Sequence, residues 1–110
     1  MRIKIGLGAL LLLCGLAVAP ASAADTLRIY RLDGSKQCEE GKTGRSLDRD
    51  AQALSRLGIA IRSMKKLYHP TMVNIMMCGT TSTRANTYVI RASDWRRHGK
   101  RLAGFKPWPR

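Results

Sequence analysis

The sequence is 110 residues long and carries 20 Lys and Arg against 7 Asp and Glu, which gives a formal net charge of +13 at pH 7. A chain of this length can form one small domain, which excludes a dinucleotide-binding Rossmann domain, a barrel enzyme and a polytopic membrane protein. Charge of this size and sign indicates an anionic partner, but it indicates neither a fold nor an activity.

The first 23 residues have the three parts of a secretory signal peptide. Arg2 and Lys4 form a cationic start, residues 5–18 are uncharged and rich in leucine, and Ala21-Ser22-Ala23 offers the small side chains that a signal peptidase accepts. The apolar run is shorter than the approximately 20 residues that a transmembrane helix needs. We therefore expect a cleaved signal peptide and no transmembrane anchor.

Cleavage after residue 23 would leave residues 24–110 as one small domain with a basic C-terminal tail. The domain would lie in the periplasm or outside the cell. Because the removed segment takes only two cations with it, the mature chain keeps a net charge of about +11. An exported location argues against RNA or chromosome binding in the cytoplasm.

Cys38 and Cys78 are the two cysteines that remain after cleavage, because Cys14 lies in the signal peptide. An even pair in an oxidising compartment is typical of a structural disulfide. A bond that closes a loop of about 40 residues stabilises a small domain by about 4 kcal/mol in the chain-entropy model. We expect this bond to be a large part of the stability of the domain.

The first half of the mature chain predicts a strand and a helix. Residues 27–32 alternate apolar and basic side chains, apart from Tyr30, which predicts a half-exposed strand. Ser46 is a favourable N-cap for a helix whose apolar stripe begins at Leu47 and continues to Leu57. Gly58 follows at the position of a C-cap.

The second half predicts three strands and a second helix. Residues 59–64, 72–78 and 87–91 are β-type runs, and a link at 65–71 contains the turn signal His69-Pro70. A helix is expected around 95–102, capped by Ser93 or Asp94. The order β-α-β-β-β-α is most simply an α+β fold, a small antiparallel sheet with two helices on one face and one disulfide.

The chain also resembles a group of small secreted proteobacterial proteins of unknown function. The resemblance depends on Cys38 before a helix, on Met76-Met77-Cys78-Gly79, on residues 86–90 and on residues 102–106, and it covers most of 27–108. It implies a disulfide-linked α+β domain, and it implies no activity and no catalytic residue.

A Cys followed by five residues and an Arg, at Cys78 and Arg84, is the spacing of the phosphate-binding loop of protein tyrosine phosphatases. The match is partial, because Met77 stands where that family has His and Ala85 where it has Ser or Thr. A disulfide at Cys78 would also remove the thiolate. We therefore expect a structural cysteine, and we retain Arg84 as an anion-binding residue.

Two further groups of residues could carry chemistry. His69 and His98 could act as the acid and base of a ribonuclease, but nothing in the sequence brings them together. Thioethers and an imidazole suit Cu(I), and a cluster of this kind is formed by Met64, His69, Met72, Met76 and Met77. Because Met beside Val and Ile more often fills a core, we assign no metal, no cofactor and no catalytic residue.

Positive charge is densest near the C-terminus, with Trp95, Phe105 and Trp108 among the cations. The predicted anion-binding residues are Arg84, Arg91, Arg96, Arg97, Lys100 and Arg101. We expect a noncatalytic binding or accessory protein that engages an anionic envelope component, an acidic protein or extracytoplasmic nucleic acid. The alternatives are a small secreted phosphoesterase or ribonuclease-like hydrolase, a periplasmic copper-binding protein, and a cationic face that serves solubility alone.

Overall fold

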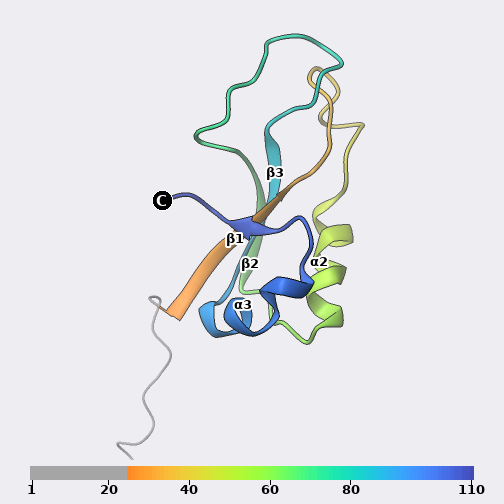
Figure 1. Ribbon diagram of the computed structural model, residues 1–110. Coiled ribbons are helices and arrows are strands. Elements are labelled where there is room, and N and C mark those ends of the chain that lie inside the picture. The colour runs from red at the N-terminus through yellow and green to blue at the C-terminus, as the bar shows by residue number, and fades with distance from the viewer. Residues whose placement is uncertain (1–24) are drawn as a thin grey trace, which may run out of the picture.

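The computed structural model describes residues 25–110 and shows an α+β domain (Figure 1). Its antiparallel sheet has four strands in the order β2-β3-β1-β4. The elements in chain order are β1 (Thr26–Leu32), α2 (Leu47–Arg56), β2 (Ser63–Tyr68), β3 (Arg84–Arg91), α3 (Ala92–His98), the 3-10 turn η3 (Gly99–Arg101) and β4 (Lys106–Pro107). The predicted fold class is confirmed, whereas the predicted signal peptide at 1–23 lies outside the described residues.

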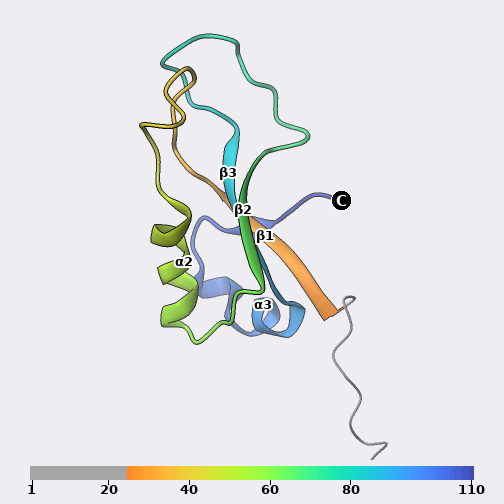
Figure 2. The ribbon, with the colours of Figure 1, turned by 180° about the vertical axis from the view of Figure 1, so that it is seen from behind.

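The hydrophobic core lies between one face of the sheet and both helices. Ile29 of β1 stands opposite Tyr88 of β3, and both side chains are fully buried. Leu54 of α2 packs into the same cluster, and the partly buried Trp95 of α3 packs against it. Both helices therefore cover one face of the sheet, as expected from the sequence (Figures 1 and 2).

The strand at 27–32 and the first helix are confirmed almost residue for residue. Ser46 caps α2, because its Oγ accepts a hydrogen bond from the backbone N–H of Arg49 at 3.1 Å. The helix ends at Arg56, and Gly58 follows with a φ of +77°, a conformation that favours glycine. The capping residues and the apolar stripe thus determine both ends of α2.

The second strand lies further along the chain than predicted. Residues 59–64 were expected to form it, but β2 begins at Ser63 and takes in the first half of the expected link. Ile59 is instead 3 % exposed in the connection from α2, where it packs into the core. The strand contains Lys66, whose ammonium group is satisfied inside the protein, so its polar sequence does not prevent a strand there.

The strand predicted at 72–78 is wrong. These residues follow an irregular path between β2 and β3, and most of their side chains face solvent. Their Val, Ile and Met content favours β-structure, but side-chain hydrogen bonds and the Cys78 disulfide hold the backbone out of the sheet. Residues 72–78 therefore have the composition of a strand, but they pair with none of the strands within residues 25–110.

The C-terminal region differs in two details. The second helix begins at Ala92, with Arg91 at the N-cap position and no side-chain capping bond from Ser93 or Asp94, and it gives way to η3 at Gly99. The tail adds a short strand that the sequence did not predict, since Pro107 stands opposite Ile29 at the sheet edge. An edge strand tolerates proline because it needs hydrogen-bond donors on one side only.

The predicted disulfide between Cys38 and Cys78 is confirmed, with the two Cα atoms 5.1 Å apart. It joins the connection after β1 to the connection before β3, near the end of the domain away from α3 (Figure 1). The hydrophobic core occupies the other end, so this covalent bond supplies order where few apolar contacts do.

Replacing Cys78 with Ser should therefore lower the melting temperature by about 15 °C or more, since a small domain loses about 4–8 °C for each 1 kcal/mol. Thermal unfolding followed by circular dichroism measures this. The neighbouring Met77→Ser, at a side chain 59 % exposed, is the control and should shift the melting temperature by less than about 4 °C. A wild-type protein that melts at the same temperature when oxidised and reduced would contradict this account.

Candidate anion-binding surface

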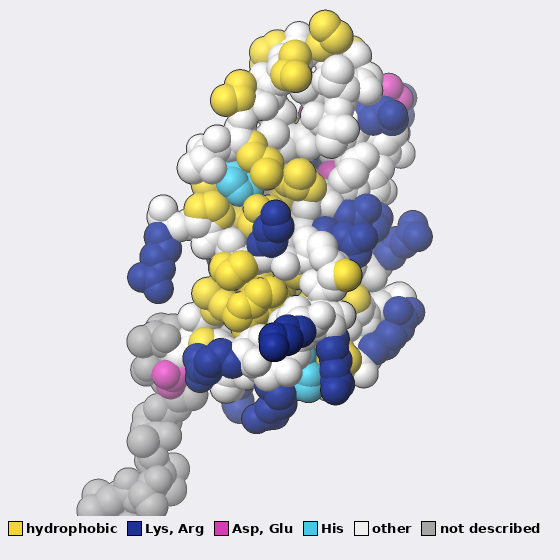
Figure 3. Space-filling view, viewed as in Figure 1, with side chains coloured by type: hydrophobic (Ala, Val, Ile, Leu, Met, Phe, Trp, Pro, Cys, Tyr) yellow, Lys and Arg dark blue, Asp and Glu magenta, His cyan; other side chains and the backbone are white. Residues whose placement is uncertain are grey.

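One end of the domain is formed by α3 and η3 and carries a cluster of exposed cations. We call this set of side chains the basic end, and it consists of Arg91, Arg96, Arg97, Lys100 and Arg101. In Figure 3, Lys and Arg side chains gather around the end where α3 lies. The ion pairs within residues 25–110 use Arg31, Arg45 and Lys66, so none of the five is neutralised there by a carboxylate.

The position of the basic end is set by Trp95. This side chain packs against the core, and a Cβ at Gly99 would approach its ring to 3.2 Å. The absence of a side chain at Gly99 thus lets the chain turn closely over the indole. The cations on either side of Trp95 point to solvent as a result.

Arg84 does not belong to the basic end. It is the first residue of β3, whereas Arg91 is the last, so the full length of the strand separates them. Its Nη1 donates to the backbone oxygen of Glu40 at 3.0 Å, and it lines a cavity of about 260 Å³ with Lys42 and Lys66. The six predicted anion-binding residues therefore divide into a group of five and one separate arginine.

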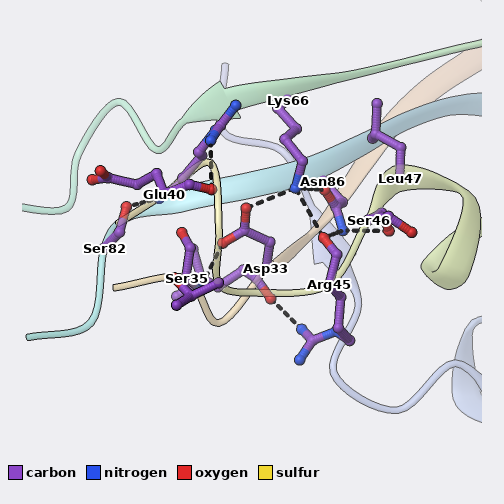
Figure 4. A network of polar contacts seen from close by, with 12 residues as sticks. Asp33, Ser35, Glu40, Arg45, Ser46, Leu47, Lys66, Ser82 and Asn86 are labelled. Carbon is purple, nitrogen blue, oxygen red and sulfur yellow. Dashed lines mark hydrogen bonds and ion pairs between the residues drawn. The ribbon is translucent and has the colours of Figure 1, made fainter. Parts of the chain in front are cut away.

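A buried polar network lies beside that cavity (Figure 4). The Nζ of Lys66 donates to Asp33 Oδ2 at 2.7 Å, to Asn86 Oδ1 at 2.7 Å and to the backbone oxygen of Arg45 at 2.9 Å. Asp33 is fully buried, and its Oδ1 accepts from the backbone N–H of Ser35 at 2.8 Å. Lys66 thus joins β2 to the residue that follows β1 and to the middle of β3.

Asn86 extends this network to α2. Its Nδ2 donates to Asp50 Oδ2 at 2.9 Å and to the backbone oxygens of Arg45 and Ser46 at 3.2 Å each. Asp50 is 3 % exposed, and the Nε of Arg45 donates to its two oxygens at 3.0 and 3.2 Å. Arg45 also donates to the backbone oxygen of Leu32.

This network resembles an active site in composition but has no group free to react. Burial alone would raise the pKa of Asp33, but hydrogen bonds from Lys66 and Ser35 outweigh that effect and hold the pKa below its ordinary value. An ammonium group has three donors and no acceptor, and all three donors of Lys66 are in use. The network therefore serves the fold and offers no acid, base or nucleophile.

The candidate catalytic residues are not brought together. Cys78 is bonded to Cys38 and has no thiol, and β3 instead of a helix follows Arg84, so the phosphatase-like loop is absent. His69 precedes the loop at one end of β3, whereas His98 ends α3 beyond the other end. Figure 3 shows the two histidines well separated.

His69 instead has a structural role. Its ring is buried between Tyr30 and Trp108, with ring centroids at 5.0 and 5.4 Å. Its Nδ1 accepts from the backbone N–H groups of Thr71 and Met72, each at 3.2 Å, which assigns the ring proton to Nε2. The nitrogen that accepts these bonds is not available to a copper ion.

The five residues of the predicted copper cluster are dispersed. Met64 lies on β2, Met72 lines a cavity with Tyr30, and Met76 and Met77 line a different cavity beside the disulfide. Residues 25–110 also hold no group of three or more His, Cys, Asp or Glu placed to bind a metal ion.

No helix in this part of the chain is long and apolar enough to cross a membrane.

Comparisons with protein-family models, with curated proteins and with solved structures find no match to this chain. The function must therefore be inferred from the chain itself, and the resemblance to secreted proteobacterial proteins remains an expectation.

Replacing Asp33 with Asn tests the network. At pH 7 it should lower the free energy of unfolding by about 3 kcal/mol, because it leaves the buried ammonium of Lys66 without its counter-ion. The folded-state pKa of Asp33 lies below its unfolded value of about 3.9, so its contribution is full above about pH 4 and is lost as the pH falls further.

Urea unfolding between neutral and acid pH should consequently show a gap between wild type and Asp33→Asn that narrows below about pH 4. The exposed Asp48, in the first turn of α2, provides the control substitution Asp48→Asn, which should change stability little at any pH. A gap that is absent at pH 7, or that is constant with pH, would show that Asp33 is not an ionised partner of Lys66.

Proposed function

We propose that this protein is an exported, noncatalytic binding protein whose basic end engages an anionic component of the cell envelope. The observation that carries the proposal is a set of five exposed cations, Arg91 at the end of β3 and four on α3 and η3, that have no carboxylate partner within residues 25–110. Surface cations that serve only solubility are commonly interspersed with acidic groups, whereas unopposed cations at one place attract a polyanion.

The spacing of these cations favours an extended ligand. The seven residues of α3 and the three of η3 together extend for about 16 Å. A small anion would contact one or two of these side chains, whereas a chain or surface with several negative groups would contact most of them. The phosphate groups of lipopolysaccharide and an acidic protein face both have that character.

The placement of the charged groups also favours binding over hydrolysis. The charged groups of the interior, Asp33, Asp50 and Lys66, are already bound to neighbouring side chains and backbone groups. The side chains of the basic end, by contrast, are exposed and keep their charge available to a partner. We therefore assign no catalytic residue.

The basic end can be tested by replacing Arg96, Arg97, Lys100 and Arg101 together with Gln. Because each cation near an anionic surface contributes about 1 kcal/mol, the Kd for lipopolysaccharide or heparin should rise at least tenfold, and its dependence on salt should become weaker. Titration calorimetry at two ionic strengths measures both quantities.

The matched control removes the same charge elsewhere, at four exposed cations: Lys36, Lys42, Arg49 and Arg56. This control should weaken binding much less than the quadruple change on α3 and η3. Equal losses in the two variants would mean that only net charge matters, and the assignment of the basic end would then be wrong.

A further inference from the structure

The connection between β2 and β3 exposes five large apolar side chains, which we call the apolar tip. Its members and their exposed fractions are Met72 (42 %), Val73 (85 %), Ile75 (66 %), Met76 (90 %) and Met77 (59 %). Figure 3 shows hydrophobic side chains collected at the end of the molecule that this connection forms. Single exposed apolar residues are common in proteins, but five large ones within a single short connection indicate an interaction surface.

The segment that carries the apolar tip has no ionisable charge. No Asp, Glu, Lys or Arg occurs in residues 70–83, although these four types make up 25 % of the whole chain. When a surface moves from water into an apolar medium, each charge on it raises the free energy of the transfer, because the charge loses its hydration. The apolar tip can therefore enter an apolar medium without that cost.

Two polar side chains of the same segment bond to its own backbone. Asn74 accepts at Oδ1 from the backbone N–H of Thr83 at 3.0 Å, and the hydroxyl of Thr80 donates to the backbone oxygen of Met77 at 2.7 Å. Gln37 reaches across from the first connection, and its Nε2 donates to the backbone oxygen of Ile75 at 3.1 Å. The conformation of the segment is thus fixed by polar contacts while its apolar side chains remain outside.

Both ends of the segment are also held. His69 accepts the backbone N–H groups of Thr71 and Met72 at its start, and the disulfide from Cys78 to Cys38 fixes its end. A segment ordered in advance loses little conformational entropy when it binds. This preorganisation is a reason to treat the exposure as a functional property of the fold.

We propose that the apolar tip inserts into the surface of an anionic lipid bilayer. Tyr68 is 54 % exposed and lines one cavity with Met76 and Met77, and the exposed Lys36 is paired in a bridge with Thr81 beside the base of the segment. A tyrosine and a lysine close to exposed aliphatic side chains match the headgroup layer of a membrane, where both residue types are enriched.

Charge complementarity favours an anionic bilayer. The two connections at this end carry equal numbers of cations and carboxylates, Lys36, Lys42 and Arg45 against Asp33, Glu39 and Glu40, so the tip itself is close to neutral. The charge that attracts an anionic surface belongs to the domain as a whole, because residues 24–110 keep 18 Lys and Arg against 7 Asp and Glu, a net charge of +11. This attraction reaches further in dilute salt.

This inference does not rest on the proposed function. The eight residues of β3 separate the apolar tip from the basic end by about 23 Å, which is well beyond the screening length of about 8 Å in physiological salt. The two surfaces can therefore be disabled one at a time, and a failure of one proposal can be distinguished from a failure of the other.

The test is co-sedimentation of the protein with vesicles of phosphatidylcholine that contain about one quarter phosphatidylglycerol, in about 0.15 M salt. Replacing Ile75 and Met76 together with Ser should lower the partition coefficient at least tenfold. A factor of ten corresponds to about 1.4 kcal/mol, and the transfer of two large apolar side chains out of water contributes more free energy than that. Met64→Ser, at a side chain 40 % exposed on β2, is the matched control and should bind within about twofold of wild type.

Two further measurements complete the experiment. Ile75→Trp should show a blue-shifted indole fluorescence when vesicles are added, whereas Met64→Trp should show no shift. The Ile75→Ser/Met76→Ser protein should retain lipopolysaccharide binding. The variant with four Gln in the basic end should bind anionic vesicles less tightly but should still show the blue shift of Ile75→Trp, which reports insertion of the apolar tip.

Wild-type protein that stays in the supernatant, or equal sedimentation of the wild-type and Ile75→Ser/Met76→Ser proteins, would overturn the proposal. So would a wild-type dimer in the absence of lipid that the double substitution converts to a monomer while vesicle binding is unaffected. That last result would assign the apolar tip to a second copy of this chain.

Discussion

The structure depends on the ammonium group of Lys66, which binds the side chains of Asp33 and Asn86 and the backbone oxygen of Arg45. Lys66 and Asp33 form an ion pair at 2.7 Å inside the protein, and Asn86 links this pair to the Asp50–Arg45 pair at the start of α2. One network thereby joins β2, the residue after β1, the middle of β3 and the first turn of the helix. Buried charge is costly unless every partner is present, so the network permits one arrangement of these elements and penalises others.

The sequence predicted those features that depend on local pattern. Ser46, Gly58 and the apolar stripe of α2 determine a helix with both ends, and the count of cysteines determines the disulfide. The network was not predicted, because the contacts of Lys66 and Asn86 connect residues 20 to 41 positions apart, and the sequence placed Lys66 in a link. Asn86 offered no signal either, since the predicted strand began at Thr87, whereas β3 begins at Arg84.

The wrong strand at 72–78 follows from the same limitation. Its composition is that of a strand, but composition does not show whether a neighbouring strand edge is free to accept it. In the structure, β3 is already paired with β1 and β2, and Gln37 binds the backbone of Ile75 instead. The error is informative, because apolar residues that neither pair nor pack are the ones that form the apolar tip. Arg84 and Arg91 lie apart because they stand at the two ends of β3.

The central claim is that the basic end is the surface that binds an anionic partner. The most direct measurement is the change in backbone amide chemical shifts when heparin is titrated into isotopically labelled protein. The account predicts that the largest shifts lie between Arg91 and Arg101 and that Trp95, on the core side of α3, moves less. Largest shifts around Arg84 and Lys42, with little change in α3 and η3, would contradict it.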